Sequence, residues 1–488
     1  MPDHVDVAVI GAGVGGLATA IRLQAAGHCV TVVERREVTG GKLASQRHDG
    51  FTFDVGPSLL TLPAVFDDLF RVAGTSLDDE LELVRLDPQF RYHWPDGSTL
   101  TVPDHPEATA AAFDVFAPGA GAEWRRFDGR GRHIWDVSAR TFLAGTMEGP
   151  RDLLRRMRST SDLLAIDPFR SLHRLADRTF SDPRLVQWAG RYATYSGSSP
   201  FLAPATLACI PHIESRFGCW YPMGGLDALR AALERVAIRL GVEVRLGVEV
   251  AAITGGERAD GIELADGTVL RTTVVVANAD AEHVYGDLLG DADELRRVRR
   301  ARRSTSGLVI IAAVRDATPG VGHHTVWFGA DDRAEFAALA AGRMADDPTI
   351  YACVSSVTDP SQAPGGEENW FLLVNAPAGL ELDRDAERAH ILDVLAARGL
   401  DLRPRISWSD VAAPADLAAR YRAPGGAIYG ASSNGRRAAF LRPRNRARRR
   451  GLYLVGGSSH PGGGLPLVAI GAEIVAGLVA ADLAGARR

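Results

Sequence analysis

Buried-type apolar runs and helical apolar spacing follow one another at the start of the chain. Residues 5–10 form a short apolar run, glycines follow at 11, 13, 15 and 16, and apolar positions then recur at helical spacing to about residue 26. Gly27 fits a helix terminator, and residues 30–33 form a second apolar run that ends at Glu34. This order predicts a strand, a helix and a second, parallel strand.

Two later stretches repeat the pattern of strands and helices. Residues 226–240 carry leucine and valine at helical spacing, residues 242–253 and 274–276 read as strands, and Asp266-Gly267 predicts a hairpin turn. Residues 452–455 predict a last strand, which a glycine-rich turn and a helix from about Leu465 follow. We therefore predict an α/β fold with a discontinuous Rossmann-type domain (residues 1–80, 222–290 and 440–488). An α+β, partly helical substrate domain takes residues 81–221 and 291–439.

Composition excludes several classes of protein. The 488 residues carry a formal net charge of −5, which gives no global attraction to nucleic acid. Four scattered cysteines without a C-x-x-C pair argue against a disulfide framework, a zinc site or a dithiol centre, and favour a reducing compartment. We expect no signal peptide. The apolar stretch 465–483 contains Glu473 and Asp482, so we expect a buried helix there rather than a membrane span.

The first glycine cluster is the strongest chemical signal. Gly11 permits a tight turn, Gly13 lets the backbone approach a pyrophosphate, and Gly16 allows close packing of the helix. The helix N-terminus stabilises phosphate charge, and Glu34 is placed to accept hydrogen bonds from a ribose. Because both strands, the helix and the acid are present, we predict a dinucleotide site.

The residues after Glu34 identify the dinucleotide. Arg35 follows, and then Gly40-Gly41-Lys42, an arrangement typical of FAD oxidases and desaturases. Lys42 is the only lysine of the chain and could offset phosphate charge, although an ordinary surface position would also explain it. No second G-x-G-x-x-G follows a strand, so we expect no separate nicotinamide domain.

The last glycine cluster, residues 456–466, contains His460-Pro461 and opens the final helix. Its backbone N–H groups and the helix N-terminus suit the flavin N1–C2=O edge, where negative charge develops on reduction. Many flavoproteins carry an acid in this turn, whereas this sequence has Ser458 and Ser459.

At this point several segments together resemble a known family, the bacterial and fungal type phytoene desaturases and their carotenoid desaturase relatives. The resemblance covers residues 5 to about 482. Its segments are 50–58 (Gly-Phe-Thr-Phe-Asp-Val-Gly-Pro-Ser), 275–280, 323–326 (His-His-Thr-Val), 357–361, 442–445 (Arg-Pro-Arg-Asn) and the His460-Pro461 turn. It implies the fold of the amine-oxidase and desaturase flavoproteins, non-covalent FAD, and removal of hydride and proton from a long isoprenoid polyene such as phytoene or an acyclic hydroxycarotenoid.

Two departures from the family pattern bear on substrate and site. Met223 stands where a basic residue is usual in the Pro-x-Gly-Gly element. The Gly-Gly-Gly spelling of the last turn, with residues 429–435 and 438–442, is closer to later-step desaturases, which include 3,4-desaturases of hydroxylated or methoxylated carotenoids. The FAD contacts expected from motifs and resemblance are Gly11, Gly13, Gly15, Gly16, Glu34, Arg35, Gly41, Lys42, Gly56, Pro57, Ser58, Val250, Asn278, Gly457, Ser458, Gly464 and Leu465.

Catalytic groups are harder to choose, because polyene desaturation needs little beyond orientation and a weak base. We consider Asp136, Arg140 and Glu214, with His212 beside it, against the simpler interpretation of ion pairs and helix caps. His460 is favoured because its turn should lie beside the flavin, although it could equally be a hydrogen-bonding strut. The adjacent His323 and His324 should point to opposite faces of a strand, so one of them could line the pocket and no metal is expected.

The segment 151–180 is rich in arginine, with Leu153, Leu154, Met157, Leu163 and Leu164 interleaved. A basic amphipathic surface can lie on anionic lipid, and the resemblance implies action at a membrane surface. We therefore expect a cytoplasmic protein that binds the membrane peripherally. The expected electron acceptor is oxygen or a quinone. A solvated helix face is the alternative. We expect the basic run 442–450 on a surface loop. Other functions considered are a flavin amine oxidase, a redox-neutral flavin isomerase and a non-enzymatic FAD-binding escort protein.

Overall fold

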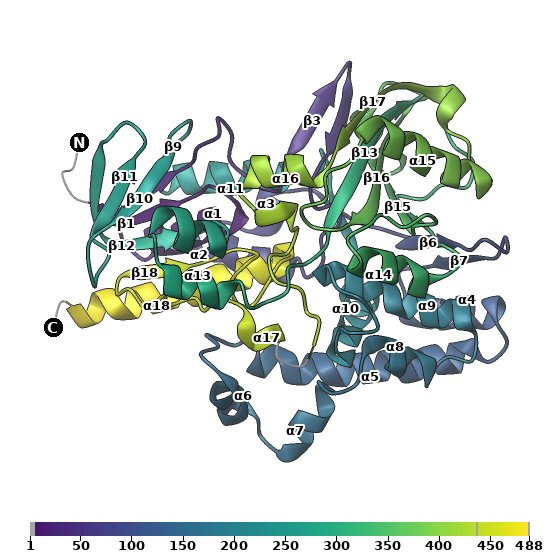
Figure 1. Cartoon of the computed structure of the whole chain (residues 1–488), viewed down its shortest axis with the longest axis horizontal. Helices are drawn as coiled ribbons and strands as arrows, with labels where there is room; N and C mark the ends of the chain where they lie inside the picture. Colours follow the sequence, from purple (N-terminus) through teal and green to yellow (C-terminus); the bar gives the residue numbers. More distant parts are fainter. Residues whose placement is uncertain (1–4, 436–437, 487–488) are drawn as a thin grey trace.

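The computed structural model describes residues 5–435 and 438–486 and contains two large seven-stranded sheets (Figure 1). In the first sheet the strand order is β10-β11-β12-β1-β2-β9, and β18 also pairs with β12. Strand β1 lies parallel to both β2 and β12, whereas β11 is antiparallel to β12. The strands are β1 (Val5–Ile10), β2 (Val30–Val33), β9 (Glu243–Arg245), β10 (Val250–Thr254), β11 (Gly261–Leu264), β12 (Val269–Ala277) and β18 (Leu452–Leu454).

Helices cover this sheet and explain its apolar central strands, because parallel strands are buried on both faces. Helix α1 (Val14–Ala25) packs against α11 (Leu226–Arg239), α18 (Leu465–Ala486) and α2 (Ala64–Val72). By length and composition α18 could cross a membrane, but one of its faces, including Ala472, Val475 and Val479, is buried in the core shared with α1. Because 39% of this apolar stretch is buried, the burial that the sequence predicts is confirmed for that face alone.

The second sheet lies in the other half of the molecule (Figure 1) and has the order β17-β13-β16-β15-β14-β6-β7. All nine residues of its strand β13 are buried, which matches the apolar run 306–314. The strands are β6 (Phe90–His93), β7 (Thr99–Val102), β13 (Ser306–Val314), β14 (His324–Trp327), β15 (Ile350–Val354), β16 (Glu368–Ala376) and β17 (Ile406–Ala412). Two small sheets are β3 (Ser45–His48) with β4 (Phe51–Asp54) and β5 (Leu83–Arg85) with β8 (Trp220–Pro222).

A helical layer lies below the second sheet in Figure 1. It consists of α4 (Pro106–Phe116), α5 (Ala120–Thr141), α8 (Leu172–Asp177), α9 (Pro183–Arg191) and α10 (Cys209–Phe217), with α6 (Pro150–Arg156) and α7 (Thr160–Ala165) at the bottom of the view. The other helices are α3 (Leu77–Glu80), α12 (Ala281–His283), α13 (Ala292–Val298), α14 (Asp332–Ala340), α15 (Arg384–Ala397), α16 (Pro414–Tyr421) and α17 (Ala438–Leu441).

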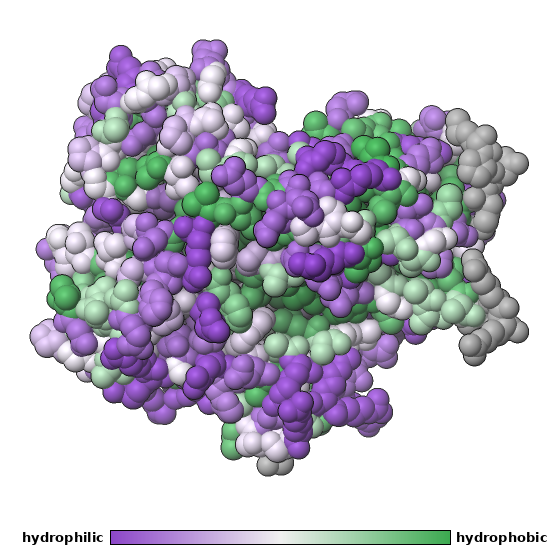
Figure 2. Space-filling view, turned by 180° about the vertical axis from the view of Figure 1, so that it is seen from behind, coloured by the Kyte–Doolittle hydropathy of each residue, from purple (hydrophilic) through white to green (hydrophobic). Residues whose placement is uncertain are grey.

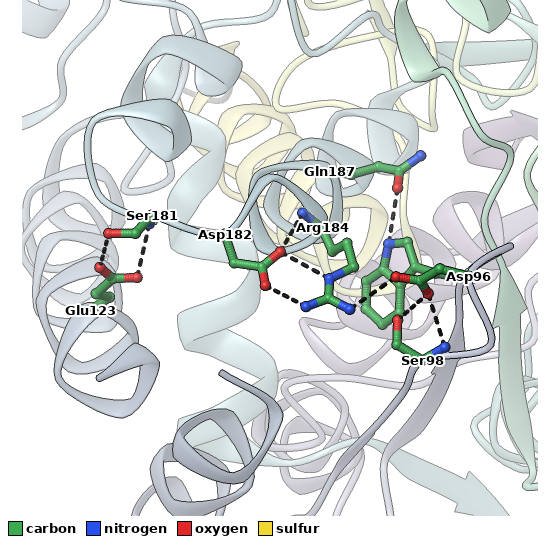
Figure 3. Close-up of polar contacts among 8 residues, drawn as sticks. Asp96, Ser98, Glu123, Ser181, Asp182, Arg184 and Gln187 are labelled. Carbon is green, nitrogen blue, oxygen red and sulfur yellow. Dashed lines mark hydrogen bonds and ion pairs between the residues drawn. The ribbon is translucent and has the colours of Figure 1, made fainter. Parts of the chain in front are cut away.

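Polar contacts at the N-terminus of helix α9 fix this helix on the edge of the second sheet (Figure 3). Asp182 caps the helix by accepting from the Arg184 backbone N–H at 2.8 Å. The Arg184 guanidinium joins this carboxylate to Asp96 in the turn between β6 and β7, and Trp94 donates to Gln187 at 2.9 Å. The clamp therefore sets the position of the helix that ends at Arg191.

The first sheet draws its strands from the N-terminal, middle and C-terminal stretches of the chain that the sequence analysis singled out. The residue bounds assigned to the two domains stay a prediction.

Candidate active site

One continuous cavity of about 960 Å³ joins the glycine turns of the first sheet to apolar side chains of the helical layer and the second sheet. Every FAD contact expected from the sequence lies on its wall except Gly16. The cavity therefore has two parts, which we call the cradle and the apolar chamber. The cradle is the backbone turns at residues 11–15, 40–42 and 456–465, and the apolar chamber is the remainder.

Glycine is required at the first turn by close backbone approaches. Gly11 has φ of 91°, and a Cβ there would lie 2.6 Å from the carbonyl oxygen of Asn278. The Asn278 side chain donates to the Gly11 carbonyl at 3.1 Å and ties the turn to the end of β12. Gly16 sits one turn inside α1, where a Cβ would lie 2.1 Å from the Gly11 carbonyl oxygen. Its role is packing of helix on turn, so the expected direct contact of Gly16 with FAD does not fit this structure.

The segment after β2 runs back alongside the first turn. The Gly40 N–H donates to the Ala12 carbonyl at 2.7 Å, and the buried Glu34 carboxylate accepts from the Ala12 N–H at 2.8 Å. The Lys42 ammonium donates to the Ile428 carbonyl. Burial lowers the pKa of Lys42, and the nearby Asp280 opposes that effect. Lys42 therefore brings a half-buried cation to the cavity wall, rather than one on the outer surface.

The last glycine turn is held from behind by Arg442. Its guanidinium donates to the carbonyls of Gly457 at 3.0 Å, Tyr429 at 3.1 Å and Ala431 at 2.7 Å. Burial lowers the pKa of Arg442 to about 10. The expectation of a surface loop for 442–450 is therefore wrong at Arg442, although the sequence offers no local signal for its burial.

His460 does not lie on the cavity wall, although its neighbours Pro461–Leu465 do. The ring is 2% exposed, packs edge-on against Phe142 and shares a hydrogen bond of 3.0 Å between Nε2 and the Gly145 carbonyl. Burial lowers its pKa to about 4, so the ring is neutral near pH 7. A catalytic role for His460 does not fit this placement, because the turn separates the ring from the cavity; the strut alternative does.

The other expected contacts close the cradle from the side. A Cβ at Gly56 would lie 1.8 Å from the Lys42 carbonyl oxygen, and the Ser58 and Tyr351 hydroxyls are 2.7 Å apart. Arg35 donates to the carbonyl of Ala419 at 2.9 Å, at the end of α16.

The residues of the cradle fit an FAD molecule. Glycine residues of three turns line the cavity, and the N-termini of α1 and α18 would supply partial positive charge for phosphate and for the flavin. Glu34 would supply an acceptor for a ribose, and Lys42 would supply a cation.

The apolar chamber is lined by side chains from α5, α9, α10, β6, β15 and β16. They include Phe90, Trp135, Ile210, Ile213, Phe371 and Leu373, and Phe142, Phe328 and Tyr429 join them from the segments between elements. Leu154 and Phe169 also line it, and they are 57% and 64% exposed, so the chamber reaches the surface near α6 and α7.

Two of the catalytic candidates lie away from the chamber. Asp136 is exposed on α5, and Arg140 forms a two-pronged ion pair with Asp162 at 2.7 and 2.9 Å. That pair lowers the pKa of Asp162 to about 2. The catalytic assignment of Asp136 and Arg140 does not fit this structure, because neither side chain reaches the cavity wall.

Glu214 lies one layer behind the chamber and is 2% exposed. Its carboxylate accepts from the hydroxyls of Tyr195 at 2.6 Å and Tyr192 at 2.9 Å, and Tyr195 lines the chamber. Burial raises the pKa of Glu214 above its usual value, although both tyrosines oppose the shift. His212 instead pairs with Asp128 at 2.9 Å.

His323 and His324 do not point to opposite faces. His323 lies in a bend before β14, so strand alternation does not apply, and the two ring centres are 4.6 Å apart. Neither lines the cavity. With Cys353 they form a buried group whose ligand atoms lie within 4.8 Å of one another. Such a group could hold an ion, so the expectation of no metal stays a prediction.

Comparisons with known proteins agree with this site. The family described as "Flavin containing amine oxidoreductase" matches residues 14–476. The chain is 36% identical to 4,4'-diapolycopene oxygenase of Methylomonas sp and 38% identical to hydroxyneurosporene desaturase of Cereibacter sphaeroides, each over 99% of both chains. Cyclohexylamine oxidase from Brevibacterium oxydans has the same fold at 15% identity, with a TM-score of 0.62 over 98% of this chain and 99% of that one. The chain belongs to the FAD-dependent family of flavin-containing amine oxidoreductases, within its carotenoid desaturase branch.

Proposed function

We propose that this chain is an FAD-dependent desaturase that takes hydride and a proton from adjacent carbons of a long carotenoid polyene. The observation that carries the proposal is the continuity of the cradle with a largely apolar chamber, which suits an isoprenoid chain that lies against bound flavin. The printed names of the relatives, a hydroxyneurosporene desaturase among them, support a carotenoid substrate.

The chamber contributes orientation and exclusion of water. FAD, when bound, would supply the hydride acceptor, and oxygen or a quinone would be the oxidant that takes up its electrons. Phe371 and Leu373 on β16 and Ile210 and Ile213 on α10 offer apolar surface to a flat polyene. These side chains would hold an allylic carbon of the polyene at contact distance from the hydride acceptor. This positioning accounts for much of the catalysis, because little acid–base chemistry is needed.

A proton must leave the carbon next to the one that loses hydride. After hydride loss the polyene is a delocalised cation and a strong acid, so a weak base is enough. We propose that the Tyr195 oxygen accepts this proton while its own proton passes to Glu214 Oε1. The short hydrogen bond between the two, and the raised pKa of the buried carboxyl group, suit that transfer. Glu214 thus keeps a catalytic role, through Tyr195.

We further propose that the chamber opens toward a membrane. Leu154, Leu164 and Phe169 are exposed around α6 and α7, and Arg151, Arg155 and Arg158 are exposed beside them; the side chain of Leu163 lies outside the described residues. Figure 2, seen from behind, has α6 and α7 in the lower lobe and hydrophobic residues in the hollow above it. Exposed apolar side chains flanked by arginine suit the surface of an anionic lipid bilayer in which the polyene is dissolved.

The alternatives fit less well. An amine substrate carries a positive charge, and the guanidinium of Arg191 on the chamber wall would repel it. A redox-neutral isomerase would use the same cavity and differs only in its product. An escort protein would not need Tyr195 and Glu214 beside the cavity.

The test uses the purified FAD-loaded enzyme and an acyclic carotenoid in liposomes without oxygen. We expect the flavin to bleach and the product to have two hydrogens fewer, as measured by mass spectrometry. Reduction by amines alone, or a product of unchanged mass, would contradict the proposal. In air, a product with an added oxygen atom would assign an oxygenase activity instead.

A further inference from the structure

Arg191 is a half-buried cation on the wall of the chamber, and the proposed chemistry does not use it. It is the last residue of α9, which Arg184 and Asp182 anchor at the other end. Its guanidinium carbon lies 5.3 Å from the ring centre of Phe90, 5.9 Å from Tyr92, 5.5 Å from Tyr195 and 5.5 Å from Tyr351. These rings come from β6, β15 and the 3₁₀ turn (Tyr192–Ser196) that follows α9, so residues distant in sequence converge on one charge.

The charge lacks a partner of opposite sign. Among the described residues no carboxylate lies within ion-pair distance of Arg191, and its Nη1 is buried without a hydrogen-bond partner. Glu214 lies behind Tyr192 and Tyr195, and its carboxylate accepts hydrogen bonds from both of their hydroxyl groups. Ring faces attract a cation but accept hydrogen bonds poorly, so the Nη1 donor of the guanidinium remains without an acceptor, although Tyr195 forms a hydrogen bond with the same group.

Such a group would be costly beside a pure hydrocarbon. A buried donor without an acceptor loses its hydration, and a hydrocarbon polyene removes the remaining water from the chamber without replacing it. An oxygen atom on the substrate would restore the missing acceptor. The surrounding aromatic rings would still pack against the apolar carbons next to that oxygen.

We propose, building on the desaturase function, that Arg191 is a polar subsite that binds an oxygen atom at one end of the polyene. The substrate class is an acyclic carotenoid with a terminal hydroxyl, methoxy or carbonyl group. Tyr195 lies beside Arg191, so the bond that is desaturated lies within a few carbons of the oxygen-bearing carbon. The relative from Cereibacter sphaeroides, whose printed name contains a hydroxylated polyene, is consistent with this class.

The first test needs only the wild-type enzyme. An acyclic carotenoid hydrocarbon and its terminal alcohol, with the same number of conjugated double bonds, are compared in the same liposomes. A hydrogen bond to a charged group predicts kcat/KM about 10- to 100-fold higher for the alcohol. A terminal aldehyde of equal length forms a third arm and shows whether hydroxyl or carbonyl is preferred. Equal kcat/KM for all three would overturn the subsite.

The second test uses Arg191→Gln, with Arg191→Lys to retain the charge and the exposed Arg343→Gln as a matched control. We expect the alcohol-to-hydrocarbon ratio of kcat/KM to fall about 10- to 100-fold in Arg191→Gln and less in Arg191→Lys. FAD content and Tm report folding. An equal loss for both substrates would mean that Arg191 only supports the aromatic rings, and would overturn the proposal.

The two proposals fail differently. If the wild-type enzyme desaturates neither polyene, the proposed function is wrong. If it desaturates the hydrocarbon as well as the alcohol, the function stands and the oxygen subsite is wrong.

Discussion

The cradle and the apolar chamber belong to one cavity but are built in different ways. The cradle is made of backbone: in its glycine-rich turns a Cβ at Gly11 or Gly40 would collide with a neighbouring carbonyl group. The chamber is made of side chains that arrive from six or more separate elements, and its polar corner at Arg191, Tyr195 and Glu214 joins α9, the turn after it and α10.

This difference decides how each part tolerates change. A backbone site is lost when a Cβ is added, because the atoms it meets belong to rigid turns. A side-chain site changes its selectivity or rate when one group is replaced, because the surrounding packing persists. Variants in the two parts should therefore separate loss of cofactor from loss of chemistry.

The largest effect is expected at Gly16. In Gly16→Ala the new methyl group meets the Gly11 carbonyl oxygen at 2.1 Å, so the first turn must move away from the helix N-terminus. We expect the purified protein to lose nearly all of its FAD, measured as flavin absorbance per protein, and to unfold at lower temperature.

Gly477→Ala on α18 is the matched control, because nothing lies within 4 Å of its added Cβ. Replacing a helical glycine by alanine stabilises by up to about 1 kcal/mol, so this variant should keep FAD and its Tm should not fall. Full FAD retention in Gly16→Ala would show that the turn is softer than its geometry indicates.

The second effect concerns the chamber alone. Tyr195→Phe keeps the ring and removes the oxygen between the polyene and Glu214, so kcat should fall about 100-fold or more while FAD remains bound. Tyr192→Phe removes the other hydroxyl group on Glu214, which does not line the cavity, and should cost far less. Similar kcat values for the two variants would contradict the proposed proton transfer through Tyr195 to Glu214.

The proton path also sets a pH dependence. Glu214 must be ionised to receive a proton, and burial raises its pKa, so kcat should rise with pH through a value above that of an ordinary glutamate. Below that pKa, kcat should fall about tenfold per pH unit. Stopped-flow bleaching of the flavin from pH 4 to 9 measures this limb. In Glu214→Gln the residual rate should show no such limb; an unchanged limb would assign it to another group.

The same contrast explains what the sequence could predict. Glycine spacing, Glu34 and Lys42 are local in sequence, so the cradle could be predicted residue by residue. The place of Arg191 on the cavity wall could not be predicted, because its environment is formed by rings from β6 and β15 that are distant in sequence. The position of the His460 ring could not be predicted for a related reason. The glycine-rich turn is local in sequence, but the direction of the ring depends on contacts with Phe142 and Gly145.

His460 offers a way to sharpen the comparison through stability. Its pKa falls from 6.5 to about 4 on folding, so its contribution is present above pH 6.5 and is lost as the pH falls toward 4. At pH 5 this loss amounts to about 2 kcal/mol. The free energy of unfolding of His460→Gln should decline correspondingly less than that of the wild type between pH 7 and 5. If the free energies of unfolding of the two proteins declined equally with pH, folding would not lower the pKa of His460.

The smallest effect concerns the mouth of the chamber. Replacing Leu154, Leu164 and Phe169 together by serine should weaken binding to anionic liposomes about tenfold, because partly inserted apolar area is lost. Val115→Ser is the control, since that side chain is 89% exposed on α4, away from α6 and α7 (Figure 1). Flotation with liposomes measures the binding, and FAD content should stay unchanged because the cradle is untouched. Equal flotation of both variants would mean that α6 and α7 form an ordinary solvated face, and that the polyene enters the chamber by another route.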